Sequence, residues 1–302
     1  MNEITASWIR SVLPKRHSDA NKGTFGRVLV IAGSIKYTGA AYLACSGAMR
    51  VGAGLVTLAT PASLVSILAA KLTEATYLPL PVSSAGVLAP QAVRLVRQSL
   101  GGYNALLIGC GIGRQPATDR FVKALLLNQD IKLPPIVIDA DALNILATTQ
   151  DWWHKMTENA ILTPHPGEMS RLTGKSVIEI QNDRVVTAKE KALEWRKTIV
   201  LKGANTVIAS LEGDVKVNPV ANPGLASAGT GDVLAGVIAG LMAQGLKLQD
   251  AAACGVYLHS QAGEIVREQL GDTGMLASDL LPALPIVIKR LKESPSTGAG
   301  RK

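Results

Sequence analysis

The sequence is poor in aromatic side chains and in cysteine. Phenylalanine, tyrosine and tryptophan together make up 4% of the 302 residues. They do not interleave with basic runs, so we expect no nucleic-acid partner. The three cysteines, Cys45, Cys110 and Cys254, are far apart and form no CxxC motif. This pattern argues against a zinc site or a disulfide framework and favours a reducing compartment, so we expect a cytoplasmic protein.

Long apolar segments are also scarce. The N-terminus lacks the apolar core of a secretory signal. Residues 51–70 are free of charge and long enough to span a bilayer. However, Pro61 divides them into a strand pattern and a short helix pattern, and no second segment accompanies them. We therefore expect no membrane partner.

The composition is otherwise that of a large α/β protein. Hydrophobic residues make up 47% of the chain, which also has 29 glycines, so a sizeable core with close helix-on-sheet packing is available. The net charge of +8 is spread along the sequence. This charge is typical of solvated surfaces, and it also suits an anionic small molecule such as a nucleotide.

Strand-like and helix-like segments alternate along most of the chain. This order predicts βαβ units and a mostly parallel sheet with helices on both faces, in three α/β/α layers. We expect a single domain over residues 1–302, with a core at about 22–291 and a disordered tail at 294–302. The predicted strands are 27–33, 54–60, 104–109, 134–139 and 160–164, then three short ones within 198–219; helices follow at 229–244, 249–269 and 276–292.

Turns of unusual composition follow several of these strands. In an open parallel sheet, ligands bind beyond the carboxyl ends of the strands, so these turns are predicted to share one edge. The turns are AGS at 32–34, GCGIG at 109–113, DAD at 139–141, TPHPGE at 163–168 and KGANT at 202–206.

The segment AGTGD, residues 228–232, is the strongest candidate for an anion site. Gly229 and Gly231 allow successive backbone N–H groups to converge, and the helix that follows adds its positive end. Thr230 lies between the two glycines. Asp232 would then lie near enough to take a proton from a hydroxyl that attacks the phosphate. The alternative is that Asp232 is an ordinary helix N-cap.

The KGANT turn places Lys202 at a strand end. Its ammonium could meet a phosphate, while the turn's backbone holds a ribose or adenine. A plain hairpin turn is the alternative. If the ammonium meets the nucleotide, Lys202→Ala should weaken nucleotide binding and leave stability without ligand almost unchanged.

The TPHPGE turn contains the most convincing histidine. Two prolines fix the backbone around His165 and so favour one ring orientation. Glu168 is a candidate Mg²⁺ ligand, directly or through water. Asp139 follows a buried strand and is either an outer metal ligand or the cap of the next helix. His17, His154 and His259 lack such neighbours and are interpreted as surface or packing residues.

Familiar catalytic and phosphate motifs are missing. TGKS at 173–176 ends like a Walker A loop, but Met169 stands where that motif needs glycine. GCGIG has Arg114 and Pro116 where a dinucleotide fingerprint needs its third glycine. We find no Ser/His/Asp triad, no HExxH and no GxSxG.

Four ordered motifs give the chain a family resemblance. NPGLASAGTGDVLAGVIAGLMAQG, ILTPHPGEMSRL, VIDADALN and LKGANTVI resemble the ADP/ATP-dependent NAD(P)H-hydrate dehydratases of the ribokinase-like superfamily, from Lys22 to Leu291. The resemblance implies a repair enzyme. Such an enzyme returns the 6S hydrate of NADH or NADPH (NADHX or NADPHX) to the reduced dinucleotide, consumes ADP or ATP with Mg²⁺, and releases AMP and phosphate in the ADP form.

The resemblance also implies roles for individual residues. Asp232 becomes the catalytic, hydrate-binding residue, and His165 becomes a hydrate contact at a position where related kinases usually have asparagine. Ala228 departs from the glycine that many relatives have there. The further expected hydrate contacts are Ala40, Gly111 and Gly113, and the expected ADP or AMP contacts are Lys202, Gly203, Ala204, Asn205, Thr206, Gly229, Thr230 and Gly231.

Relatives of this kind are expected to be homotetramers. Many bacterial ones carry an epimerase domain before the dehydratase. Only residues 1–26 precede the first predicted strand here, so we expect the epimerase to be a separate protein. Two other functions stay open: a ribokinase-like kinase acting on a thiazole or pyrimidine alcohol, and a nucleotide-binding module without turnover.

Overall fold

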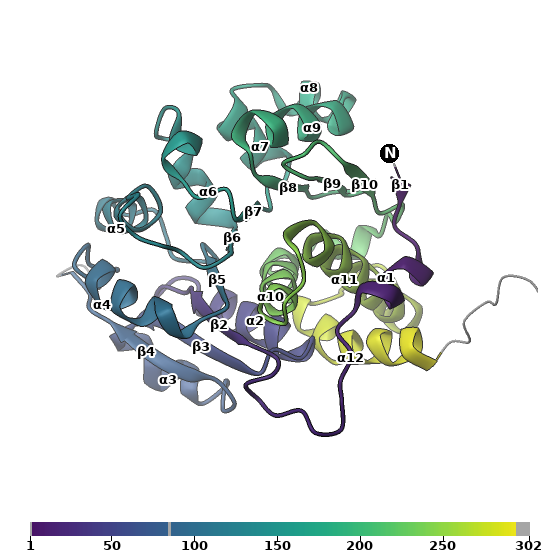
Figure 1. The fold of residues 1–302 in the computed structure, drawn as a ribbon, viewed down its shortest axis with the longest axis horizontal. Coiled ribbons are helices and arrows are strands. Elements are labelled where there is room, and N and C mark those ends of the chain that lie inside the picture. The colour runs from purple at the N-terminus through teal and green to yellow at the C-terminus, as the bar shows by residue number, and fades with distance from the viewer. Residues whose placement is uncertain (1, 84–85, 294–302) are drawn as a thin grey trace, which may run out of the picture.

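One ten-stranded sheet runs through the chain and is covered by helices on both faces (Figure 1). The computed structural model describes residues 2–83 and 86–293, so the tail predicted at 294–302 lies outside the described residues. The strand order is β1-β10-β9-β8-β7-β6-β5-β2-β3-β4. β9 is antiparallel to both of its neighbours, and the other described pairings are parallel. The strands are β1 (Asn2–Glu3), β2 (Arg27–Ile31), β3 (Leu55–Pro61), β4 (Thr76–Leu80), β5 (Ala105–Ile108), β6 (Ile136–Ile138), β7 (Ala160–Leu162), β8 (Thr198–Leu201), β9 (Val207–Ala209) and β10 (Val215–Val217).

The helices form two layers, each with its own hydrophobic cluster, so the predicted three-layer α/β/α architecture is confirmed. The layer that contains the C-terminal helices comprises α1 (Ala6–Val12), α2 (Thr38–Arg50), α3 (Val65–Ala69), α10 (Thr230–Ala243), α11 (Leu248–Leu270) and α12 (Ala277–Glu293). The opposite layer comprises α4 (Ala92–Ser99), α5 (Pro116–Leu126), α6 (Ala140–Leu146), α7 (Pro166–Thr173), α8 (Val177–Asn182) and α9 (Arg184–Trp195).

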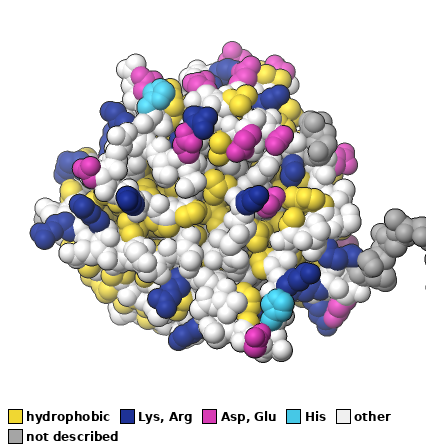
Figure 2. Space-filling view, viewed as in Figure 1, with side chains coloured by type: hydrophobic (Ala, Val, Ile, Leu, Met, Phe, Trp, Pro, Cys, Tyr) yellow, Lys and Arg dark blue, Asp and Glu magenta, His cyan; other side chains and the backbone are white. Residues whose placement is uncertain are grey.

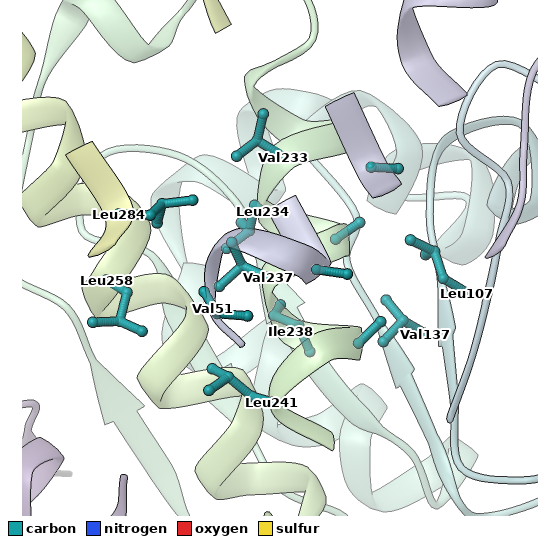
Figure 3. Packing of buried hydrophobic residues seen from close by; sticks show 14 of the residues in the cluster. Val51, Leu107, Val137, Val233, Leu234, Val237, Ile238, Leu241, Leu258 and Leu284 are labelled. Carbon is teal, nitrogen blue, oxygen red and sulfur yellow. The ribbon is translucent and has the colours of Figure 1, made fainter. Parts of the chain in front are cut away.

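Helix α10 is the centre of its layer. It is apolar on nearly every side because it packs against the sheet and against several helices. In Figure 3 its side chains, Val237 and Ile238 among them, lie between Leu107 and Val137 of the sheet and Leu258 and Leu284 of the neighbouring helices. This packing fixes the N-terminus of α10 and therefore fixes Asp232.

Several elements went unpredicted, among them β1, α1 and β4. The first strand is β1 at Asn2–Glu3, which pairs with β10, and not the strand that begins at residue 27. Helix α1 follows β1. A two-residue strand is too short to show periodicity. The edge strand β4 also went unpredicted, because it contains Pro79 and is only partly buried.

The charge-free residues 51–70 form β3, a 3₁₀ turn and α3, as the division at Pro61 predicted. Across residues 2–83 and 86–293, no helix has both the length and the apolarity needed to cross a membrane. On the face drawn in Figure 2, lysine and arginine are scattered among acidic and neutral side chains.

Candidate active site

Four neighbouring strands bring polar side chains to one edge of the sheet. Cys110, Asp139, Thr163 and Lys202 follow β5, β6, β7 and β8, which are adjacent in the order β8-β7-β6-β5. Asp232 reaches the same place from α10, so that ligand atoms of Cys110, Asp139 and Asp232 all lie within 4.8 Å of one another. The shared edge predicted from the turns is therefore present.

Lys202 lies inside this cluster as an internal cation. Its Nζ lies 2.7 Å from Asp139 Oδ1 and 3.8 Å from Glu168 Oε2. The Thr163 hydroxyl donates a second bond, of 2.6 Å, to the same Asp139 oxygen. Burial alone would lower the pKa of Lys202, but the Asp139 and Glu168 carboxylates outweigh it and hold the pKa above its usual value. The ammonium is therefore charged.

The two residues predicted as metal ligands do not fit a directly bound Mg²⁺. The Lys202 ammonium already lies between Asp139 and Glu168, where a second cation would be repelled. Glu168 Oε2 also accepts a 2.8 Å bond from the His165 N–H. Cys110 adds no suitable ligand, because burial raises the pKa of its thiol and Mg²⁺ prefers oxygen. The role of Asp139 and Glu168 as metal ligands stays a prediction that this pairing does not favour.

Asp139 does not cap helix α6. It occupies the N-cap position, but its carboxylate makes no capping hydrogen bond. Its Oδ1 instead accepts bonds from Thr163 and Lys202, and the Cys110 Sγ lies 3.8 Å from its Oδ2. The capping alternative is therefore wrong, and the carboxylate belongs to the site.

The AGTGD turn forms an anion cradle at the start of α10. Gly229 has φ +89° and is the N-cap, so Asp232 is the third residue of the helix and not its cap. Within the described part of the chain, the N–H groups of Gly231 and Asp232 have no hydrogen-bond partner. Two free N–H groups at the positive end of a long helix can bind a phosphoryl group.

The environment of Asp232 prepares it to act as a base near neutral pH. Burial raises the pKa of Asp232 to about 7, and the nearby Asp139 carboxylate adds to this shift. A bond from the Cys110 thiol and the Lys202 charge oppose it. The carboxylate can therefore both take up and release a proton at physiological pH.

A cavity of about 430 Å³ lies beside the cradle. The KGANT turn is a hairpin between the antiparallel strands β8 and β9, as the plainer alternative predicted. The same turn also forms part of the cavity wall, with the exception of Asn205, whose N–H donates to the Val220 carbonyl. The predicted nucleotide contacts on the wall are Lys202, Gly203, Ala204, Thr206, Thr230 and Gly231.

His165 is oriented by its role as a helix cap. Its Nδ1 accepts bonds from the N–H groups of Gly167 (3.0 Å) and Glu168 (3.4 Å), and Pro166 begins α7. The single ring orientation predicted from the prolines thus has a capping box as its physical cause. Burial lowers the pKa of His165, and the Lys202 charge adds to this shift. The half-exposed ring is therefore neutral and carries its hydrogen on Nε2.

The three other predicted hydrate contacts lie near one another. A Cβ atom on Gly111, at φ +63°, would stand 2.7 Å from Ala40 Cβ and 2.6 Å from Tyr37 Cβ. The Gly113 N–H donates a 2.9 Å bond to Asp141 Oδ2. The GCGIG turn therefore packs closely on the start of α2, and its role in binding the hydrate stays a prediction.

Sequence reasoning missed several residues of the site. Asn218 and His259 are both buried and line the cavity. Arg184 donates a 2.9 Å bond to the Leu201 carbonyl behind the KGANT turn. The surface or packing role predicted for three histidines agrees with exposed His17 and His154 and with buried His259, but the prediction did not place His259 at the cavity. A histidine within an apolar helix was the available signal for His259.

We expect Lys202→Ala to lower the free energy of unfolding by about 3 kcal/mol, because it leaves the buried Asp139 carboxylate without its partner. This corrects the expectation that stability would hardly change. ADP affinity should fall as well. Urea unfolding measures the first effect, with Lys175→Ala as the control, since Lys175 forms an exposed ion pair with Glu190. Equal stability losses in the two variants would contradict the internal role of Lys202.

The sequence matches the family described as NAD(P)H-hydrate dehydratase over residues 28–286. A bifunctional NAD(P)H-hydrate repair enzyme, Nnr, of Moorella thermoacetica is 47% identical over 99% of this chain. The chain spans 56% of that relative's length. It is 36% identical to the ADP-dependent (S)-NAD(P)H-hydrate dehydratase of Neisseria meningitidis, over 96% of this chain and 94% of the relative.

The fold is similar to a solved structure of the same kind. The ADP/ATP-dependent NAD(P)H-hydrate dehydratase of Bacillus subtilis, co-crystallised with ATP and Mg²⁺, superposes with a TM-score of 0.82. It is 34% identical, and the match covers 96% of this chain and 98% of that one.

Proposed function

Because the chain belongs to the NAD(P)H-hydrate dehydratase family, we propose that it uses ADP to dehydrate the 6S hydrate of NADH or NADPH. The products are the reduced dinucleotide, AMP and phosphate. The observation that carries this proposal is the placement of Asp232, whose carboxylate meets Cys110 and Asp139 at the start of α10. The N–H groups of Gly231 and Asp232 have no partner among the described residues, and Gly231 lines the cavity. A base beside a phosphoryl cradle is what the reaction requires.

In the proposed mechanism, Asp232 accepts the proton of the C6 hydroxyl of the hydrate. The oxygen then attacks the β-phosphoryl group of ADP, the P–O bond to AMP breaks, and AMP leaves. The N–H groups of Gly231 and Asp232 stabilise the charge on the transferring phosphoryl group. Elimination of phosphate from C6, with loss of the proton from the neighbouring ring carbon, restores the double bond.

The ligands are assigned to two neighbouring regions. ADP occupies the cavity beside the KGANT turn, and the hydrate lies toward His165, Ala40, Gly111 and Gly113. Mg²⁺ would enter with the nucleotide phosphates. A homotetramer and a cytoplasmic location complete the proposal. They rest on the family resemblance and the sequence rather than on the geometry.

Product analysis tests this function. Purified protein is incubated with the 6S hydrate of NADPH and ADP, and we expect equal amounts of NADPH, AMP and free phosphate. Recovery of the reduced-nicotinamide absorbance follows the reaction, and omission of ADP is the control. A stable phosphorylated product would instead indicate a small-molecule kinase. Nucleotide binding without hydrate-dependent phosphate release would indicate a binding module.

A further inference from the structure

We propose that His259 is a positioning residue that aims the Gly231 N–H at the transferring phosphoryl group. The inference rests on the proposed function for its reaction, but it starts from His259, to which the proposed mechanism gives no role. His259 lies on α11, is buried, and forms part of the cavity wall beside the cradle.

The imidazole holds one peptide group of the cradle. His259 Nε2 lies 2.9 Å from the Thr230 carbonyl oxygen. A carbonyl can only accept, so Nε2 carries the hydrogen and donates it. The Thr230 carbonyl and the Gly231 N–H belong to the same trans peptide, in which these two groups point in opposite directions. Because His259 holds the Thr230 carbonyl, it also restrains the direction of the Gly231 N–H.

The Thr230 side chain cannot replace this contact. Its hydroxyl lies 2.8 Å from the Leu225 carbonyl and 2.9 Å from the Ser227 carbonyl, so it anchors the preceding turn instead. Among the described side chains, His259 is the one that bonds to the Thr230 carbonyl.

The histidine contributes direction rather than charge. Burial lowers the pKa of His259 to about 4, and its bond to the Thr230 carbonyl offsets only part of this effect. The ring is therefore neutral under physiological conditions. It can hold the peptide without adding a positive charge near the Lys202 ammonium.

Two variants separate positioning from packing. His259→Phe keeps a ring of similar size but has no donor, whereas His259→Gln offers an amide N–H at similar reach. Misalignment of the Gly231 N–H should weaken stabilisation of the transition state more than it weakens ADP binding. We therefore expect kcat to fall about 10- to 100-fold in His259→Phe, with KM for ADP within about threefold. His259→Gln should recover at least about tenfold of that loss. His17→Phe, at an exposed histidine, is the control.

A second readout does not depend on turnover. In the wild-type protein, addition of ADP should move the amide proton resonance of Gly231 downfield, and this shift should be lost in His259→Phe and restored in His259→Gln. A wild type that shows the shift but does not dehydrate the hydrate would overturn the proposed function and keep this inference. Unchanged kcat in His259→Phe, equal losses in both variants, or a shift independent of residue 259 would overturn the inference.

Discussion

Replacing Asp232 with asparagine should reduce kcat for hydrate dehydration by about a thousandfold or more, within the range expected when a general base is removed. Asparagine has the same shape and keeps the backbone N–H groups of the cradle, so the ADP dissociation constant should stay within about threefold of the wild type. Calorimetric titration with ADP and single-turnover kinetics measure the two effects separately. Asp130→Asn, at an exposed acid, is the matched control.

The partly buried carboxylate of Asp232 also gives the same experiment a pH dependence. Because burial raises its pKa to about 7, kcat/KM of the free wild-type enzyme should fall as the pH decreases through about 7. The folded protein holds this proton more tightly than the unfolded chain, so ionisation of Asp232 lowers stability as the pH rises toward 7. Asp232→Asn should therefore gain stability relative to the wild type at pH 8, and less so at pH 5. Full turnover in Asp232→Asn, with ADP affinity kept, would contradict the assigned role.

The position of the site was predictable because it follows from sheet geometry. Parallel strands end at one edge, so polar residues after successive apolar runs had to come together there. Asp139, Thr163 and Lys202 do so after β6, β7 and β8. The three-layer architecture was predictable for a similar reason, since buried apolar strands need helices on both faces.

The partners within the site were not predictable. The ion pair between Lys202 and Asp139 joins residues 63 positions apart, and no local pattern distinguishes it from a lysine facing a ligand. The bond from His259 to Thr230 likewise joins two helices, so it depends on how α10 and α11 pack. Local periodicity specifies which face of an element is buried, but it does not specify which polar atoms meet across elements.

The site also depends on a close helix contact that lies outside it. Asp232 is placed by the N-terminus of α10, and α10 is placed by its packing on α2. Glycines on both helices allow their backbones to approach: a Cβ atom on Gly47 would lie 2.6 Å from the Val233 carbonyl oxygen, and one on Gly240 would lie 2.7 Å from the Ala48 carbonyl oxygen. These small residues thus set the distance between α2 and α10, and with it the position of Asp232.

Gly236→Ala should lower the free energy of unfolding by about 2–4 kcal/mol, because the added methyl group would stand 2.0 Å from the Ala44 carbonyl oxygen and only a backbone shift can relieve that overlap. Alanine favours a helix interior by up to about 1 kcal/mol over glycine, so helix propensity acts in the opposite direction and is too small to compensate. Gly39→Ala in α2 is the matched control, since its new methyl group would meet nothing within 4 Å. Urea unfolding of both variants should show a clear loss in Gly236→Ala and no loss in Gly39→Ala. Wild-type stability in Gly236→Ala would mean that α2 and α10 can separate without cost, and the close backbone contact would then not be what places Asp232.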